Sequence, residues 1–366
     1  VNKNTTHMPL KVLIDIGHPA HVHYFKNFIW TMQDKGHTVY IVARDKEVAF
    51  KLLDFYKFSY FNRGKGRNGF IGKILYLFRG DFFILKKALK LKPDIFLSTG
   101  SSYAAHVAWL MRKPHIALDD TDHNFFQHLM YVPFTKAILT PKVFQKNFKE
   151  KHVRFDAFLE LGGLHPKRFK IEPEGLQKNL SPDNQGKFVI LRFVSWQATH
   201  DIGLKGLSLD DKYKLVQELS KYAKVVISSE EKLPDDLMAY SFKVHPALMH
   251  TVLSEASLLV SESLTMAAEA AFVGTPVLCI STAQAGTLDE EVRLGLIELY
   301  RNSNGLIERA VEIMKDPQFK EQFKEKSKNI IKNKTDITGF LVWFVENFPT
   351  SFAEIKKNPE LESKFR

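Results

Sequence analysis

The segment SESLTMAAEAAFVGTP, residues 261–276, has the residue types and spacing of an anion site at the start of a helix. Its pattern predicts a strand that ends at 261–263 and a helix that begins near Thr265. The first N–H groups of a helix lack intrahelical partners and lie at the positive end of its dipole, so they can hold a diphosphate. Glu269 lies one turn further and could reach a ribose diol. The pattern also fits a plain capped helix, with Ser263 or Thr265 as N-cap and Glu269 solvated.

A second chemical motif is DIGHPAHVHYFKNF, residues 15–28, in which Gly17 ends a predicted strand. His18 and His21 lie in the turn, and His23 follows them. Histidine titrates near neutral pH, so one of these side chains could be the general base for an acceptor hydroxyl. His18 is the first candidate because it directly follows the strand. The spacing also admits a metal site or imidazoles that only cap the helix; no third ligand with a matched acid accompanies them, so we expect no metal.

Two further polar turns follow predicted strands. Thr99, Gly100 and Ser101 make a tight turn before a helix and could contact the donor or the acceptor of a transfer reaction. Asp119 and Asp120 open an acidic cluster after another strand. Neighbouring carboxylates raise each other's pKa, so Asp120 could act as a base. The alternative is that this cluster caps the next helix.

The segment RFVSWQATHDIG, residues 192–203, follows a strand in the second half of the chain. Arg192 could bind a phosphate through two hydrogen bonds, or it could be an outward residue of the strand. Ser195 comes three residues later and would face the cleft as a contact for the nucleotide sugar. His200 and Asp201 could contact sugar hydroxyls.

The elements that must position these residues are strands alternating with helices, which predicts an α/β fold with parallel, doubly wound sheets. Strands are predicted at 11–17, 36–45, 92–102, 114–120, 136–141, 187–195, 224–230, 257–263 and 275–281. The predicted domains are 1–165 and 187–337, joined by a polar linker at 166–186. Residues 338–366 form a helical segment that could pack back on the first domain. Ligands of such domains bind at the carboxyl ends of the strands and in an interdomain cleft.

The composition excludes several classes of protein. With 45% hydrophobic and 25% charged residues, the 366-residue chain is neither disordered nor collagenous. Its one cysteine, Cys279, excludes an internal disulfide framework and a cysteine zinc site, and fits a reducing cytoplasm. No uncharged apolar run reaches the length of a membrane-spanning helix. We therefore expect a cytoplasmic protein that is soluble or peripheral to the inner face of the plasma membrane.

The positive charge, +11 in all, is concentrated in residues 51–92, where eleven Lys and Arg face two acidic residues. The same stretch is rich in Phe and Tyr. Cations beside exposed aromatic rings suit an anionic bilayer, and they also suit nucleic acid. A solvated surface with the Phe residues in the core is as good an explanation. Of the two candidate partners, an anionic membrane and nucleic acid, we favour the membrane.

The segment 261–276, which ends in Gly274-Thr275-Pro276, resembles the C-terminal signature of GT-B glycosyltransferases and of non-hydrolysing UDP-N-acetylglucosamine 2-epimerases. The resemblance implies that Ser263 opens the helix, that backbone amides hold the diphosphate, and that Glu269 holds the ribose. It further implies two Rossmann-type domains facing across a cleft, a nucleoside-diphosphate sugar with UDP favoured, and no protein-bound cofactor or metal. The usual glycine pair is replaced by Leu264, Thr265 and Met266, which implies a tighter diphosphate site that includes Thr265 and Met266.

The same resemblance implies roles for two more residues. His245 stands where GT-B proteins hold the nucleotide base with backbone groups, and Gln284 could touch the donor sugar. Together, DIGHPAH, RFVSWQATHDIG and the 261–276 segment resemble, over nearly the whole chain, an uncharacterised prokaryotic family near the GT-B enzymes. The signatures Gly-Thr-Arg-Pro-Glu and His-Arg-Arg-Glu-Asn of the epimerases are missing, which weakens that chemistry.

Three hypotheses about function follow. In the first, the protein is a GT-B glycosyltransferase that moves a sugar to a glycan or lipid-linked acceptor, with His18, His21 or Asp120 near the acceptor and Arg192 near the diphosphate. A lipid-linked acceptor would explain the basic, aromatic stretch, and this is why we favour the membrane over nucleic acid. The second hypothesis is a nucleotide-sugar epimerase or hydrolase, and the third is a nucleic-acid-binding or scaffold protein without catalysis.

Overall fold

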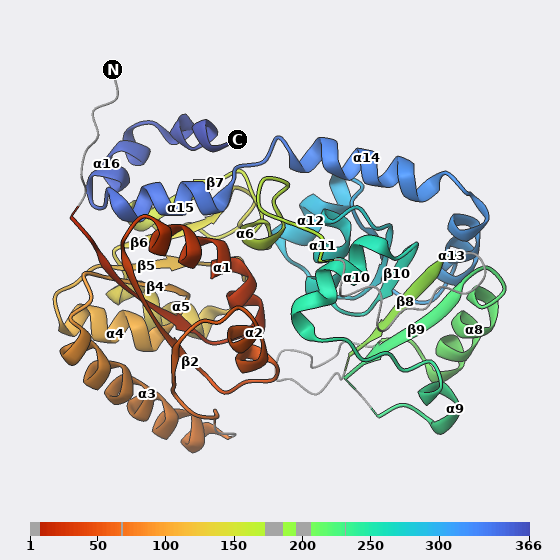
Figure 1. The fold of residues 1–366 in the computed structure, drawn as a ribbon, viewed down its shortest axis with the longest axis horizontal. Coiled ribbons are helices and arrows are strands. Elements are labelled where there is room, and N and C mark those ends of the chain that lie inside the picture. The colour runs from red at the N-terminus through yellow and green to blue at the C-terminus, as the bar shows by residue number, and fades with distance from the viewer. Residues whose placement is uncertain (1–7, 67–68, 173–185, 195–205, 231) are drawn as a thin grey trace. The chain divides into compact units, whose positions relative to one another are not determined.

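The computed structural model describes residues 8–66, 69–172, 186–194, 206–230 and 232–366 (Figure 1). The chain forms two compact units: unit 1 contains residues 1–163 and 334–366, and unit 2 contains residues 164–333. The residues just after 163 belong to unit 2, where the Glu172 N–H donates to Thr251 Oγ1 at 3.0 Å. The chain returns to unit 1 at Lys334, whose Nζ lies 2.7 Å from Asp156. The sequence analysis predicted that the first domain ends at 165 and that the second spans 187–337. In the structure the first break lies after 163 and the second before 334.

Unit 1 is built on a seven-stranded, fully parallel sheet with the strand order β3-β2-β1-β4-β5-β6-β7. The strands are β1 (Lys11–Ile16), β2 (Thr38–Ala43), β3 (Tyr60–Asn62), β4 (Ile95–Thr99), β5 (His115–Leu118), β6 (Ala137–Pro141) and β7 (His152–Phe155). Val12, Leu13 and Ile14 are fully buried, as expected for a parallel strand covered on both faces. The strand order reverses between β1 and β4, which is where ligands bind in doubly wound sheets.

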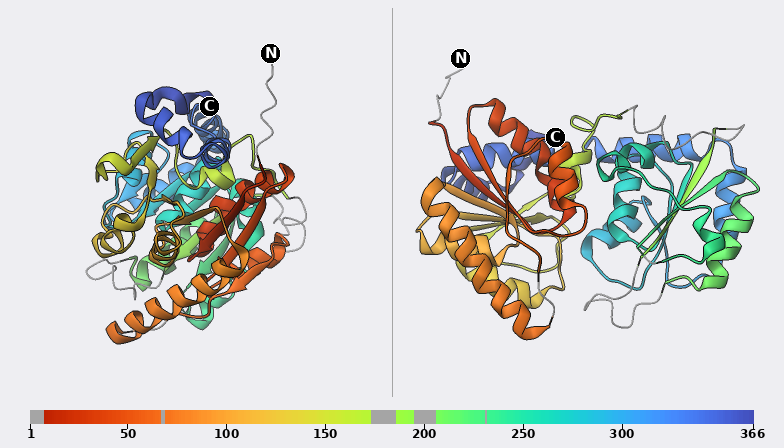
Figure 2. Two further views of the ribbon diagram at one scale, coloured as in Figure 1. Left: turned by 90° about the vertical axis from the view of Figure 1, so that its left-hand side faces the viewer. Right: turned by 60° about the horizontal axis from the view of Figure 1, so that its bottom comes forward.

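Helices cover both faces of this sheet (Figure 2). On one face, α1 (Pro19–Asp34) packs against α2 (Ala49–Phe55) and against α15 (Ile337–Glu346). On the other, α3 (Phe70–Leu91) packs against α4 (Ser102–Leu110), which packs against α5 (Phe125–Tyr131). The remaining elements are α6 (Leu161–Leu164), α16 (Thr350–Lys357), η1 (Val132–Phe134), η2 (Lys149–Lys151) and η4 (Pro359–Phe365). The C-terminal helices thus extend the helical layer of unit 1.

Unit 2 contains a five-stranded parallel sheet with the order β12-β11-β10-β8-β9. The strands are β8 (Phe188–Phe193), β9 (Lys224–Ser229), β10 (Leu258–Ser261), β11 (Val277–Ile280) and β12 (Glu298–Tyr300). The helices are α8 (Leu209–Leu219), α9 (Asp235–Met238), η3 (Pro246–Leu248), α10 (Met249–Glu255), α11 (Leu264–Phe272), α12 (Gly286–Arg293), α13 (Leu306–Lys315) and α14 (Phe319–Ile331). Apolar side chains of the sheet, α8 and α13 form one core cluster.

The sequence predicted nine strands, and the structure contains each of them with slightly shorter bounds. It also contains β3, β7 and β12, which the sequence did not predict. Each has only three or four residues, and polar side chains such as Asn62 and Arg154 interrupt its apolar pattern. These short strands lie at or next to the sheet edges, where pairing with a neighbour, and not local composition, makes them strands. In the part of the chain that the structure describes, no helix combines the length and the apolarity that crossing a membrane requires.

Candidate functional sites at the strand ends

The carboxyl edge of the unit 1 sheet brings together predicted residues that lie far apart in the sequence. Gly17 follows β1, Gly100 follows β4, and Asp119 follows β5. These three strands are direct neighbours, with Asp15 paired to Ser98 and Thr99 paired to Leu118. Adjacent strands lie about 4.8 Å apart, so the three turns form one continuous edge.

The two histidines of the first turn accept hydrogen bonds from the backbone. His18 is the N-cap of α1, and its Nδ1 accepts from the Ala20 N–H at 3.2 Å. His21 Nδ1 accepts from the Gly17 N–H at 3.3 Å. Burial, with help from the charges of His18 and Lys46, lowers the pKa of His21 to about 3, so this ring is neutral at pH 7. Because Nδ1 accepts the Gly17 N–H, the neutral His21 ring has its proton on Nε2.

The acidic turn after β5 contains two neighbouring carboxyl groups, Asp119 and Asp120. Asp119 is buried and accepts hydrogen bonds from His128 Nε2 at 2.9 Å, from Tyr131 OH at 2.5 Å and from the Thr121 N–H at 2.9 Å. Asp120 is half-buried beside it. Burial and the charge of Asp119 raise the pKa of Asp120 to about 6. A carboxylate with such a pKa is ionised at pH 7 and is basic enough to accept a proton. The raised pKa of Asp120 is what a general base would need.

A buried ion pair supports this edge, and the sequence did not predict it. Arg63, which follows β3, lies 3.1 Å from Asp15 of β1, and both side chains are 1% exposed. Ser101 Oγ, the N-cap of α4, donates to Asp15 Oδ2 at 2.5 Å. The Arg63 guanidinium also lies 4.3 Å from the ring centre of Tyr103. Asp15 of β1 therefore joins Arg63 after β3 to Ser101 at the start of α4. Neither the spacing nor the type of these residues pointed to the pair.

In unit 2, the turn between β10 and α11 is arranged around two serines. Ser261 Oγ accepts from the Ser263 N–H and donates to its carbonyl, both at 2.9 Å. Ser263 is the N-cap of α11, and its Oγ accepts from the Met266 N–H at 3.4 Å. The helix begins at Leu264, one residue earlier than predicted. Within the described residues, the N–H groups of Leu264 and Thr265 have no acceptor. These two groups are therefore open donors at the positive end of the helix.

Glu269 lies on the buried side of α11 and is paired with a histidine. Its Oε1 is 3.2 Å from His250 Nε2, a residue of α10, and the two side chains are 11% and 4% exposed. His250 is a partner that the sequence did not suggest. It holds the Glu269 carboxylate next to the first turn of α11.

Arg192, at the end of β8, is also held by neighbours. Its Nη1 donates to Ser228 Oγ at 2.9 Å, and its Nη2 forms an ion pair with Glu230, the residue after β9. The guanidinium is therefore oriented at the carboxyl edge of the sheet. A phosphate bound there would compete with, or add to, the contact with Glu230.

A buried glutamate holds the two ends of the loop after β8. Glu262 Oε2 accepts from the Val194 N–H at 2.9 Å, and its Oε1 accepts from the Leu207 N–H at 2.7 Å. The predicted ligands Ser195, His200 and Asp201 lie between these two residues, outside the described part of the chain. Glu262 is a residue that the sequence analysis missed, because a carboxylate directly after a strand gives no sign of which amides it accepts from.

Two further predicted residues lie on loops of unit 2. His245 is the N-cap of η3, and its Nδ1 accepts from the Ala247 N–H at 3.3 Å. Gln284 is exposed in the loop after β11. Arg301 shapes that loop by donating to the carbonyls of Ser281 and Ala283 at 2.9 and 2.8 Å.

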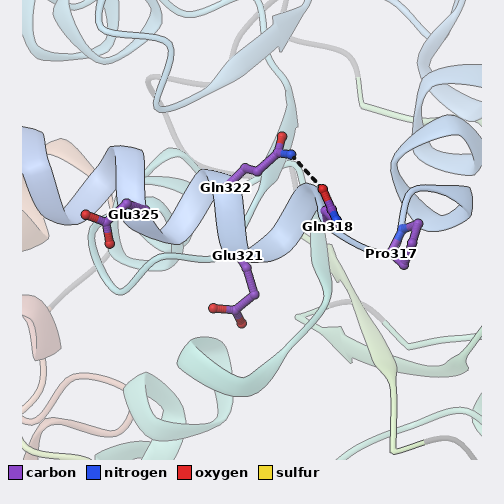
Figure 3. Close-up of a pocket in the computed structure, with 5 residues that line it drawn as sticks. All are labelled: Pro317, Gln318, Glu321, Gln322 and Glu325. Atoms are coloured by element: carbon purple, nitrogen blue, oxygen red, sulfur yellow. Dashed lines mark hydrogen bonds between the residues drawn. The ribbon is translucent and has the colours of Figure 1, made fainter.

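An open hollow on unit 2 lies elsewhere, along α14 and the two residues before it (Figure 3). It is lined by the exposed residues Pro317, Gln318, Glu321, Gln322 and Glu325. None of these residues follows a strand. The carboxylates of Glu321 and Glu325 in the hollow would repel a diphosphate. We therefore place the candidate sites at the strand ends and not in this hollow.

The chain has the GT-B fold, with two parallel sheets flanked by helices. Solved structures of UDP-GlcNAc 2-epimerases and of a glycotransferase have the same fold. A UDP-GlcNAc 2-epimerase of Neisseria meningitidis, bound to UDP-GlcNAc, matches 92% of this chain and 100% of that one, with 14% identity and a TM-score of 0.65. The UDP-GlcNAc 2-epimerase of Methanocaldococcus jannaschii matches 88% and 99%, with 14% identity and a TM-score of 0.61. The glycotransferase of kitacinnamycin matches 92% and 98%, with 12% identity and a TM-score of 0.60.

The chain belongs to the protein family of unknown function DUF354, whose model matches residues 10–290. The predicted resemblance to an uncharacterised GT-B-like family is thereby confirmed. An uncharacterised protein of Methanocaldococcus jannaschii is 25% identical over 138 residues, which is 38% of this chain and 40% of that protein. The chain thus matches less than half of the length of this curated relative.

Proposed function

We propose that this protein is a metal-independent GT-B glycosyltransferase that binds a nucleoside-diphosphate sugar, with UDP favoured, in unit 2. The observation that carries the proposal is the turn before α11. There Ser263 caps the helix, the N–H groups of Leu264 and Thr265 are open, and Glu269 is held one turn further. Open amides at a helix start suit a diphosphate. The relatives of the same fold support the choice of a nucleotide sugar, because one of them is bound to UDP-GlcNAc.

The other groups can be assigned roles within this proposal. Backbone amides of Leu264 and Thr265, together with Arg192, would stabilise the negative charge that develops on the leaving diphosphate. Asp120, with a pKa raised to about 6, would accept the proton of the acceptor hydroxyl. The neutral His21 would donate a hydrogen bond from Nε2 and so orient the acceptor, and His18 would contact the acceptor from the same turn. We assign Thr99, Gly100 and Ser101 to the acceptor side of the reaction.

The proposal is tested by placing a charge on the first turn of α11. Thr265 is exposed, so Thr265→Glu fits without steric conflict. A negative charge in the first turn of a helix stabilises it by about 0.3–1 kcal/mol. The same charge repels a diphosphate. We expect Thr265→Glu to unfold no earlier than the wild type, yet to lose at least tenfold in affinity for UDP and UDP-sugars by calorimetric titration.

Thr265→Gln is the matched control, because it adds the same bulk without the charge, and it should keep most of the affinity. Wild-type protein that binds none of UDP, GDP, ADP or dTDP, or a Thr265→Glu variant with unchanged affinity, would contradict the proposed diphosphate site.

An epimerase is the second candidate, since epimerases of the same fold match nearly the whole chain. Incubation of the protein with UDP-GlcNAc and no acceptor distinguishes the two. A transferase leaves the donor largely intact or hydrolyses it slowly, whereas an epimerase forms the C2 epimer, which NMR detects directly.

A further inference from the structure

The outward side of the α3–α4–α5 layer of unit 1 is unusually apolar. Among the described residues, these three helices contain a large share of the exposed large apolar side chains of the chain: Ile74, Leu75, Phe78, Phe82, Leu89, Trp109, Leu110, Phe125, Phe126, Leu129 and Met130. We call this set the apolar face. Phe78 is 66% exposed, Phe82 69% and Phe126 81%. Monomeric soluble proteins rarely expose so many large apolar groups in one region.

The apolar face of α3 is a regular helical stripe. Leu75, Phe78, Phe82 and Leu89 recur at spacings of three, four and seven, so they share one side of the helix. The opposite side of α3 is buried against the sheet through residues such as Ile84 and Ala88. One apolar side is enough to attach α3 to unit 1. The second apolar side is therefore not needed for folding.

The neighbouring helices extend the apolar face beyond α3. Trp109 and Leu110 end α4 on the same side of the layer as Leu129 and Met130 near the end of α5, whereas Phe125 and Phe126 begin α5 at the opposite end of the layer. The three helices lie in one layer on the same side of the sheet (Figure 2).

A histidine joins the three helices. His106 Nδ1 of α4 lies 3.0 Å from Asp81 Oδ2 of α3, and its Nε2 lies 2.9 Å from the Met130 carbonyl of α5. His106 thus connects α4 to both α3 and α5.

Basic residues border the apolar face. Arg79, Lys86 and Lys90 form a basic stripe on α3 next to the apolar stripe, and all three are exposed. Arg112 and Lys136 are exposed in the turns that follow α4 and η1. The three helices contain one acidic residue, Asp81, whose Oδ2 lies 3.0 Å from His106 Nδ1.

We propose that the apolar face, with its basic border, docks on the surface of an anionic lipid bilayer. Aromatic rings would enter the interface while Lys and Arg contact lipid phosphates. A second copy of this chain fits less well, because the two basic borders would repel each other. Nucleic acid fits less well too, because Leu and Ile side chains, unlike rings, do not stack on bases. This inference goes beyond the proposed function, since bilayer binding requires no sugar transfer, but it would bring unit 1 to a lipid-linked acceptor.

The test is sedimentation of the full chain with vesicles of phosphatidylcholine containing 30% phosphatidylglycerol, and with pure phosphatidylcholine vesicles. We expect binding to the anionic vesicles that weakens as NaCl rises from 50 to 500 mM. Phe78→Gln with Phe82→Gln, both on exposed positions, should lower the partition coefficient at least tenfold. Met238→Gln, an exposed apolar residue of α9 in unit 2, is the matched control and should bind like the wild type.

The charge contribution is tested separately. Lys86→Glu with Lys90→Glu should lower binding to anionic vesicles at least tenfold, because each basic residue near the surface contributes about 1 kcal/mol. Lys328→Glu on α14 with Lys332→Glu at the residue that follows the helix makes the same change of charge in unit 2 and should have a smaller effect.

Failure of the wild type to bind anionic vesicles would overturn the proposal, and so would equal binding by the Phe78→Gln/Phe82→Gln variant. Light scattering that shows a wild-type dimer, dissociated by the same two substitutions, would assign the apolar face to a second copy instead. UDP binding measured on the same variants is independent of these results, so a failed membrane proposal is distinguishable from a failed enzymatic one.

Discussion

At the scale of single residues, burial and hydrogen bonding decide which candidate groups can do acid–base chemistry. His18 and His21 are the most conspicuous candidates in the sequence, yet each uses Nδ1 to accept a backbone N–H. Asp120 gains its basicity from its surroundings, since burial and Asp119 raise its pKa to about 6. The chemical role of a residue therefore depends more on its neighbours than on its type.

The pKa of Asp120 predicts a pH dependence of catalysis. As a base, Asp120 must be ionised, so we expect kcat/KM to fall tenfold per pH unit below about pH 6. Asp120→Asn should lower kcat by about 10²–10⁴-fold, the typical contribution of a general base, and should remove this limb of the profile. The measurement is the initial rate of sugar transfer between pH 5 and 8.

Stability provides the control for that substitution. Because the folded state raises the pKa of Asp120, the folded state binds the extra proton between about pH 4 and 6, and stability falls as the pH rises through 6. At pH 8 the ionised Asp120 is thus destabilising. Asp120→Asn should be as stable as the wild type, or more stable, at pH 8. A lower unfolding midpoint there would show that activity is lost through misfolding.

At the scale of elements, the candidate site residues lie in the turns after the parallel strands. Buried side chains hold these turns in position. Ser101 and the Asp15–Arg63 pair connect β1, β3 and α4 in unit 1. Glu262 connects the two ends of the loop after β8 in unit 2. Buried side chains of this kind can affect function by positioning the loops that bind a ligand.

We predict that Glu262→Gln weakens nucleotide binding through the loop. Glutamine has one carbonyl oxygen, so one of the N–H groups of Val194 and Leu207 would face an NH₂ group instead. A buried unsatisfied donor costs about 1–3 kcal/mol. We expect a lower unfolding midpoint of unit 2 and a UDP affinity reduced several-fold at a temperature where the variant is folded. Glu255→Gln, at the exposed end of α10, is the control; an equal loss of affinity in that variant would contradict the role of Glu262.

At the scale of the whole molecule, each unit has its own sheet and its own hydrophobic core. Leu13 is fully buried in unit 1, and Leu215 is fully buried in unit 2. The chain crosses between the units twice, near Gly163 and Lys334. Domains with separate cores commonly unfold in separate steps.

We therefore predict that core substitutions act on one unit at a time. Leu215→Ala should destabilise unit 2 by about 2–5 kcal/mol and Leu13→Ala should do the same to unit 1. In calorimetry, each substitution should shift one transition and leave the other in place. UDP should raise the transition that Leu215→Ala lowers. A single transition shifted equally by both substitutions would show that the two units unfold as one.

The sequence alone determined the alternation of strands and helices, the parallel sheets, and the turns that carry the candidate residues. These features depend on local patterns: apolar runs, glycine at strand ends, and a serine before a helix. Only the tertiary structure decided that Asp15 pairs with Arg63, that His250 holds Glu269, that Glu262 accepts from two distant amides, and that α3 has a second apolar side facing outward. Each of these depends on which segments meet in space, and side-chain type and spacing along the chain contain too little information to specify such meetings.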